Sequence, residues 1–445
     1  MSELAADDLT LGDEVDVEVG PVAHGGHCVA RHEGRVLFVR HTLPGERVRV
    51  RITEGGPGDR FLRADAVAVL DPSEHRVDKR CPASGPGGCG GCDFQHVATG
   101  HQRELKAQIV AEQLKRLAGV EREVNVEPLD DLDGLRYRTR VEFAVDRGQV
   151  GLRRHRSHEV IALTGCPIAV PEVDEALAET LAEVAEAPGA LTGISALDVV
   201  VPSGEADTVV VEVPADAPTP PISITEIVDT PAGERAMGVD ARGFWQVHRD
   251  APRAFVEAVL AAADVREGER VLDLYCGVGL FSLPLAEAVG SSGQLIAVES
   301  DHRANEHLRD NLAEQPWALV VPGRVDDLFG VPRKGPKGTK GGRNGRGRAR
   351  GRTTRSDLLP PSADVIVLDP PRTGAGRGIV EALVSLRPRR LVYVACDPAA
   401  LARDTAYLAD LGYSMTGLRA FDAFPMTQHV ECVATFEPKE VSEHP

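Results

Sequence analysis

The second half of the chain alternates short apolar runs with amphipathic stretches, and this alternation restricts the possible fold more than any other feature of the sequence. Apolar runs predict strands at residues 271–274, 295–299, 318–321, 365–369 and 391–395. Helical stretches fit between most of these runs, which predicts a mostly parallel sheet with helices on both faces. Ligands of such sheets bind beyond the carboxyl ends of the strands. Functional residues are therefore expected immediately after the predicted strands.

The first half follows a different pattern. Between residues 10 and 72, apolar and polar residues alternate with a period of two, and glycine-rich turns separate the runs. This pattern predicts a small antiparallel barrel or sandwich, a fold that binds oligonucleotides in some proteins and not in others. Helices are predicted at 101–118 and 172–187, before a proline-rich connector at 214–221. The predicted fold class is α/β plus β, with domains at 1–72, 73–238 and 239–445.

The net charge of −18 disfavours nonspecific attraction of polyanions by the whole surface. Two segments depart from this balance. Residues 136–158 contain seven arginines and two acidic residues, and Tyr137 and Phe143 are candidate rings for stacking on bases. Residues 333–355 contain ten lysines and arginines, seven glycines and no acidic residue. This low-complexity composition predicts a disordered basic insert, placed at 333–357.

Cysteine usage and the absence of targeting signals bear on the location of the protein. No stretch approaches the ~20 apolar residues of a membrane-spanning helix, and the first residues lack the features of a secretory signal, so a cytoplasmic location is expected. Eight cysteines in 445 residues are too few for a disulfide scaffold. Four of them form a candidate metal site, namely Cys81, Cys89, Cys92 and Cys166. Thiolates select zinc or iron–sulfur, and one Cys-x2-Cys pair with two isolated partners favours a cubane cluster over structural zinc.

The first predicted strand of the second half runs into a Gly-x-Gly turn, Gly277 to Gly279, where a nucleotide cofactor can approach the backbone. The second strand ends in Glu299, where a carboxylate can bind ribose hydroxyls. A dinucleotide site prefers a third glycine where Ser282 stands, and Asp273 before the turn suits S-adenosylmethionine better. A tight turn that binds no ligand is the alternative.

Three further candidates lie at the same edge of the predicted sheet. Asp369 precedes two prolines, which hold the chain in an extended exit from the strand. Cys396 follows the fifth strand and precedes a helix start, as a nucleophilic thiol would. Glu431 near the C-terminus is a candidate general base. The alternatives are a helix-capping aspartate, an inert core cysteine and a surface carboxylate.

Taken together, these residues resemble the RNA uracil-5-methyltransferases, in particular the branch with an N-terminal TRAM domain and a [4Fe-4S] cluster. The resemblance covers nearly the whole chain and is most specific in the second half. It rests on Phe244-Trp245-Gln246, 273–279, Asp369-Pro370-Pro371-Arg372, 394–398 and Thr427-Gln428-His429-Val430-Glu431. It implies an OB-like TRAM barrel at 1–72 that binds RNA. It also implies a central domain at 73–238 that carries the cluster cysteines, and a Rossmann-like class I methyltransferase domain at 239–445.

The resemblance also assigns roles. It implies that Cys396 is the nucleophile and Glu431 the base, and that the S-adenosylmethionine and base pocket is formed by Gln246, Tyr275, Gly277, Gly279, Leu280, Glu299 and Asp369. Leu280 replaces a common asparagine and cannot hydrogen-bond the cofactor. Asp397 replaces a second common asparagine, beside the nucleophile. Its carboxylate is expected to point away from the thiol, since a nearby anion raises the pKa of a thiol.

The implied activity is methylation of C5 of a uridine in RNA through a covalent Cys–C6 adduct, by a monomer. The combination of a TRAM domain with the cluster cysteines favours 23S rRNA over the tRNA T-loop as the substrate. The cysteine loop is two residues longer than the family spacing, which keeps zinc as the alternative to iron. A remote alternative is an iron–sulfur oxidoreductase with a dinucleotide cofactor, in which Cys396 and Glu431 have no particular task. Another is an RNA-binding protein whose transferase domain is catalytically dead.

Overall fold

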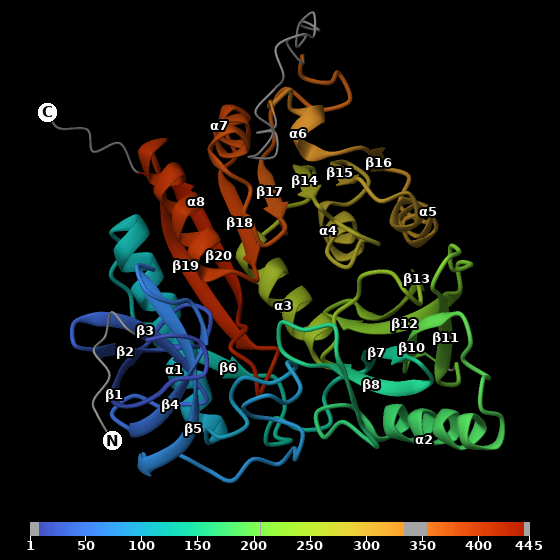
Figure 1. Ribbon diagram of the computed structural model, residues 1–445. Coiled ribbons are helices and arrows are strands. Elements are labelled where there is room, and N and C mark those ends of the chain that lie inside the picture. Colours follow the sequence, from blue (N-terminus) through green and yellow to red (C-terminus); the bar gives the residue numbers. More distant parts are fainter. Residues whose placement is uncertain (1–8, 205, 333–353, 440–445) are drawn as a thin grey trace, which may run out of the picture.

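A computed structural model describes residues 9–204, 206–332 and 354–439 (Figure 1). The predicted disordered insert falls largely on 333–353, which lies outside the described residues. None of the helices in the described ranges is long and apolar enough to cross a membrane. The domain boundaries at 72 and 238 remain a prediction.

The N-terminal region forms a closed five-stranded barrel, as predicted. Its strands pair in the order β1-β2-β3-β5-β4 and are β1 (Glu14–Val22), β2 (Cys28–His32), β3 (Arg35–Arg40), β4 (Arg47–Glu54) and β5 (Phe61–Asp71). Burial alternates along β1 and β4, so that one side of each strand fills the barrel. Figure 1 shows the barrel, in blue, beside the last strands of the chain, in red.

A helix connects the barrel to the C-terminal region. It is α1 (Thr99–Gln113), extended by the π-helical η2 (Leu114–Ala118), and it ends at Gly119 with a φ of 67°. This confirms the helix predicted at 101–118. Leu105 and Ile109 pack in the core of the barrel, whereas Val110 and Leu114 pack in the core of the C-terminal sheet. The helix therefore fixes the barrel against the C-terminal domain.

The central region contains a five-stranded antiparallel sheet in the order β11-β10-β7-β8-β9 and a separate hairpin. The sheet strands are β7 (Arg140–Asp146), β8 (Gln149–Arg153), β9 (Val160–Ala162), β10 (Ile194–Val200) and β11 (Val209–Pro214). The helix is α2 (Pro171–Glu186), and the hairpin consists of β12 (Ser223–Thr230) and β13 (Gly233–Asp240). Tyr137 and Phe143 are buried in the core of this region. The prediction that they stack on RNA bases is therefore wrong.

The C-terminal domain is built on an eight-stranded sheet in the order β16-β15-β14-β17-β18-β20-β19-β6. Its five parallel strands lie where the sequence predicts them, at β14 (Arg270–Leu274), β15 (Gln294–Glu299), β16 (Ala318–Pro322), β17 (Val365–Leu368) and β18 (Arg390–Ala395). The antiparallel β20 (Glu431–Pro438) and β19 (Tyr413–Asp422) follow. The edge strand is β6 (Val126–Pro128), which comes from the central part of the chain and pairs with β19.

Helices cover both faces of this sheet, as predicted for a parallel arrangement. They are α3 (Ala251–Ala263), α4 (Ser282–Val289), α5 (His302–Asn311), α6 (Val325–Leu328), α7 (Arg377–Ser385) and α8 (Pro398–Asp410). Neighbouring residues of one strand enter different cores. Val271 packs with α3 and α4, and Leu272 packs with α7 and α8. The strands are apolar on both faces, and their carboxyl ends carry the polar residues.

Candidate active site

A cavity of about 950 Å³ opens at the carboxyl ends of the parallel strands. Of the residues predicted for the pocket, it is lined by Gln246, Tyr275, Gly277, Glu299, Asp369, Cys396 and Glu431. Gly279 and Leu280 do not line it. Gly279 has a φ of 96°, and a side chain there would meet Leu308 at 2.7 Å, so it shapes the turn into α4. Leu280 is buried.

The turn after β14 brings backbone N–H groups to the cavity. Tyr275 and Gly277 both have a positive φ, of 62° and 57°. The Gly277 N–H donates to Glu299 Oε2 at 3.0 Å, and Glu299 Oε1 accepts from the Asp301 N–H at 2.7 Å. These bonds hold the Glu299 carboxylate at the end of β15. Oε1 also accepts from the Ser300 N–H and hydroxyl, whereas Oε2 accepts only from Gly277 among the described residues, so Oε2 keeps a position for a ligand hydroxyl.

Two carboxyls lie at this edge of the sheet, the buried Asp273 and the half-buried Asp369. Asp273 accepts a hydrogen bond from Ser282 Oγ at 2.6 Å, and its Oδ1 has no partner among the described residues. Burial raises the pKa of Asp273 to about 7, and burial also raises the pKa of Asp369 to about 7. Asp273 thus braces the start of α4, and Asp369 faces the cavity directly after β17.

The two residues predicted to do the chemistry belong to neighbouring strands. Ala395 at the end of β18 pairs with Cys432, so Cys396 and Glu431 meet at the cavity. Burial, followed by the Glu431 and Asp369 carboxyls, raises the pKa of Cys396 to about 11, and the Arg372 guanidinium opposes this shift. Burial also raises the pKa of Glu431 well above its ordinary value. Both shifts act against ionisation of the two groups.

Asp397 lies next to the nucleophile candidate in the chain, but its carboxylate engages other partners. Oδ1 accepts from the Ala400 N–H at 2.7 Å and caps α8, and Oδ2 lies 3.0 Å from His24 Nε2 of the barrel. These contacts confirm the expectation that Asp397 is directed away from Cys396. They also lower the pKa of Asp397 against the opposing effect of burial.

The turn that precedes Glu431 is fixed by polar side chains of α1, which the sequence pattern did not reveal. Met426 has a φ of 64°, its N–H donates to Gln102 Oε1 at 2.8 Å, and its carbonyl accepts from the Asp93 and Phe94 N–H groups at 2.9 Å. One helical turn along α1, the buried Lys106 Nζ donates to Asp422 Oδ1 at 2.5 Å and to the Phe424 carbonyl at 3.0 Å. The base candidate therefore follows a turn with little freedom to move.

Further residues line the cavity without having been predicted as site residues. Phe244 is 77% exposed, which is unusual for a large aromatic side chain. Its ring lines the cavity and can contact a ligand there. Arg372 and Phe424 face the same space. An aromatic residue directly before Trp245-Gln246 is the signal in the sequence that points to Phe244.

The four candidate metal-ligating cysteines line a separate cavity of about 190 Å³ beside β7 and β8. Burial raises the pKa of Cys92 to about 12 and that of Cys166 to about 11, and the other cysteines of the group add to both shifts. Across the described residues, no three of these sulfur atoms lie within 4.8 Å of one another. The four thiols thus line an open cavity and do not converge on one position close to all of them.

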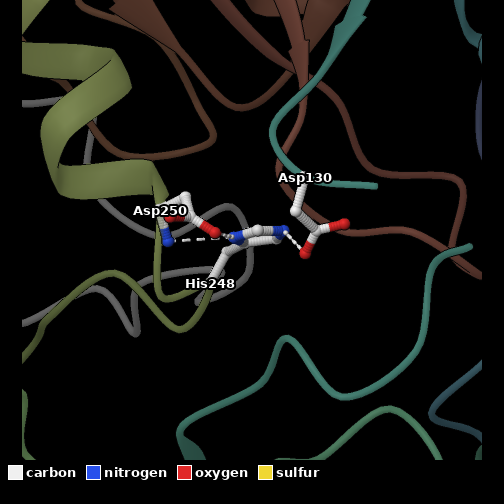
Figure 2. A group of neighbouring side chains, drawn as sticks. All are labelled: Asp130, His248 and Asp250. Atoms are coloured by element: carbon white, nitrogen blue, oxygen red, sulfur yellow. Dashed lines mark hydrogen bonds and ion pairs between the residues drawn. The ribbon is translucent and has the colours of Figure 1, made fainter. Parts of the chain in front are cut away.

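One group of potential metal ligands within the described residues is more compact, namely Asp130, His248 and Asp250 (Figure 2). His248 lies between the two carboxylates, with Asp130 Oδ2 3.3 Å from Nε2 and Asp250 Oδ2 4.0 Å from Nδ1. The Asp250 N–H donates to Nδ1 at 3.1 Å, which leaves Nε2 to carry the proton toward Asp130. His248 is held by the Asp250 N–H and by its contact with Asp130, in the segment between β13 and α3 that also carries Gln246.

Comparison with known proteins agrees with this architecture. The TRAM domain family matches residues 8–67, and the family described as tRNA (uracil-5-)-methyltransferase matches residues 347–439. An uncharacterized RNA methyltransferase of Streptomyces avermitilis is 44% identical over 96% of this chain and 99% of its own length. The 23S rRNA (uracil(1939)-C(5))-methyltransferase RlmD of Alkalilimnicola ehrlichii is 31% identical over 95% of this chain and 96% of its own.

The solved structure of Pyrococcus abyssi tRNA (uracil-54, C5)-methyltransferase in complex with S-adenosyl-L-homocysteine has a TM-score of 0.67 and 21% identity. It covers 95% of this chain and all of that one, which shows a shared fold. The doubly wound sheet with its cavity at the carboxyl edge is the fold of class I methyltransferases. With the TRAM barrel and the close relatives, the chain belongs to the RNA uracil-5-methyltransferase family.

Proposed function

We propose that this protein methylates C5 of a specific uridine in RNA, with Cys396 as the nucleophile and Glu431 as the general base. The observation that carries the proposal is that Cys396, Glu431, Gly277 and Glu299 face one cavity. A thiol, a carboxyl and a nucleotide-binding turn are the groups that this reaction requires in one place.

The chemistry follows from the weak nucleophilicity of uracil C5. The Cys396 thiolate adds to C6 of the uracil and leaves an enolate whose C5 carbon is nucleophilic. When bound, S-adenosylmethionine would supply the methyl group for C5, and its methyl–sulfur bond would break to leave neutral S-adenosylhomocysteine. Glu431 then removes the proton from C5, and the electron pair of that C–H bond restores the ring double bond and expels the Cys396 thiolate. A thiolate suits both addition and departure.

The electrostatics of the cavity support this order of events. The thiol and the Glu431 carboxyl both have raised pKa values when the cavity holds no ligand. The positive sulfonium favours the anionic form of groups that share its cavity. We infer that the bound cofactor favours the thiolate form of Cys396.

The cofactor would lie along the turn after β14. Gly277 offers the close approach of the backbone, and Glu299 offers a carboxylate for the ribose hydroxyls. Gln246, Tyr275 and Asp369 would form the remaining walls next to the uracil. Gly279 and Leu280 would act through the shape of the turn. The exposed ring of Phe244 is a candidate surface for a base extruded from its stack.

We infer that Cys81, Cys89, Cys92 and Cys166 hold a [4Fe-4S] cluster. A single zinc ion with thiolates at about 2.3 Å would hold the sulfur atoms about 3.8 Å apart. No three of these sulfurs form so tight a group in the described chain, and they line a cavity of about 190 Å³. A cubane with one thiolate at each iron fits this spacing better, and zinc is the alternative.

The RNA path proposed here leads from the barrel to the active site. A groove of about 400 Å³ lies between the barrel and the cysteine loop, and its arginines are Arg40, Arg51, Arg63, Arg154 and Arg156. Glu54 and Asp65 line the same groove, and Glu54 pairs with Arg63 and Arg156. Arg140, by contrast, is buried against Glu226 at 2.7 Å and is not available to RNA. Basic side chains in a groove position phosphates.

We favour 23S rRNA as the substrate because the relative from A. ehrlichii, which is matched over nearly its whole length, is named for that activity. The tRNA T-loop is the alternative. A monomer in the cytoplasm remains the expectation. Mapping 5-methyluridine in ribosomal and transfer RNA of a deletion strain and its parent tests the proposal. Loss of one 23S site supports it, loss of a tRNA site selects the alternative, and no loss refutes RNA methylation by this chain.

A further inference from the structure

The barrel touches both loops that carry the proposed chemistry, through a single hairpin turn. This turn, residues 23–27 between β1 and β2, is closed by the Ala23 N–H, which donates to the His27 carbonyl, and by the Gly26 N–H, which donates to the Ala23 carbonyl. His24 Nε2 lies 3.0 Å from Asp397 Oδ2, beside the nucleophile. Gly26 has a φ of 73°, and a side chain there would lie 2.6 Å from Cβ of Gln428, in the turn before Glu431. The barrel thus contacts the two segments that carry Cys396 and Glu431.

The His24 contact bears on the ionisation of Cys396, because it engages the carboxylate next to that residue in the chain. Asp397 puts a carboxylate one residue from Cys396, where an anion would oppose formation of the thiolate. The structure occupies one carboxylate oxygen with the Ala400 N–H and the other with His24. We propose that His24 is a positioning residue of the barrel, which holds the Asp397 carboxylate away from Cys396 and so keeps the thiol reactive.

The surroundings of each group support this assignment. The neighbouring charges that shift the pKa of Cys396 most are Glu431, Asp369 and Arg372. Asp397 faces His24 and Arg403. Without His24, the carboxylate keeps one hydrogen bond, to Ala400, and its other oxygen is free to turn toward the thiol. The inference rests on the proposed role of Cys396. Its test measures the reactivity of the thiol and does not require methylation.

The test measures the rate at which iodoacetamide alkylates Cys396 in the full-length protein, by peptide mass spectrometry across a range of pH. His24→Ala should slow alkylation at neutral pH about threefold to tenfold and shift the pH profile to the alkaline side. His24→Gln keeps an N–H donor at a similar distance and should stay near the wild-type rate. His24→Ala/Asp397→Asn should recover the wild-type rate, because the amide caps α8 without a charge.

Two controls separate positioning from folding. Arg47→Ala removes an exposed ion pair with Asp71 within the barrel and should leave the profile unchanged. Asp397→Asn alone should alkylate at least as fast as wild type. A wild-type profile for His24→Ala, or a failure of Asp397→Asn to restore the double variant, would overturn the inference. If instead Cys396→Ala still methylates RNA, the proposed function fails while the alkylation result stands.

Discussion

Lys106→Met should destabilise the protein by about 3–5 kcal/mol, because it removes one partner of a buried ion pair. Lys106 and Asp422 have side-chain exposures of 0% and 3%, and their charged atoms lie 2.5 Å apart. Methionine fills a similar volume, so the loss reports mainly the unpaired Asp422 carboxylate and the Phe424 carbonyl that loses its donor at 3.0 Å. The same change should loosen the turn before Glu431 and slow methylation.

Urea unfolding of the full-length protein measures the loss of stability. Lys106→Met/Asp422→Leu should recover most of it, since the second substitution removes the unpaired charge. Lys115→Met is a matched control on the adjoining η2 segment, where the pair with Glu121 is exposed, and it should leave the unfolding transition in place. A loss below about 1 kcal/mol for Lys106→Met, or no recovery in the double variant, would show that this pair does not secure the turn.

The bound metal, the RNA-binding arginines and the pH dependence of stability each give a separate prediction. Protein purified without oxygen should be brown, with absorption near ~400 nm and iron and sulfide bound to the four cysteines; colourless protein with one zinc per chain would instead establish the alternative metal. Replacing Arg153, Arg154 and Arg156 should weaken specific RNA binding and methylation, whereas deletion of 333–355 should lower only salt-sensitive affinity; a change of the target uridine on deletion would reverse these roles. Burial raises the pKa of Asp273 to about 7, so between about pH 4 and pH 7 the folded protein retains a proton that the unfolded chain releases. Wild-type stability should therefore fall relative to Asp273→Asn as pH rises through this window, and equal pH dependence in urea unfolding would contradict the assignment.

The sequence alone predicts the frame of the molecule well, because both of its main patterns are local. Period-two alternation indicates the barrel strands, and the parallel strands of the second half are apolar on both faces. The residues at their carboxyl ends then follow from topology, so Cys396, Glu299 and Asp369 meet at one cavity. The resemblance to a family adds Gln246, which no periodicity singles out.

What the sequence misses depends on contacts between distant segments. The three residues of β6 join the sheet through β19, a pairing across almost 300 residues that no local pattern contains. Gln102 and Lys106 look like solvent-facing positions of a helix, yet both are buried because they satisfy the turn around Met426. The arginines next to Tyr137 in the sequence favour a ring that stacks on RNA bases. In the structure the ring lies in the core, and its hydroxyl donates a hydrogen bond to the Pro425 carbonyl.

The most direct test of the central claim is covalent trapping with substrate RNA that carries 5-fluorouridine. The fluorine at C5 leaves Glu431 no proton to remove, so the adduct cannot collapse after methyl transfer. With S-adenosylmethionine present, mass spectrometry should find the RNA attached to the peptide that contains Cys396, and Cys396→Ala should form no such adduct. Rapid methylation of normal RNA by a protein that never forms this adduct would contradict the covalent mechanism.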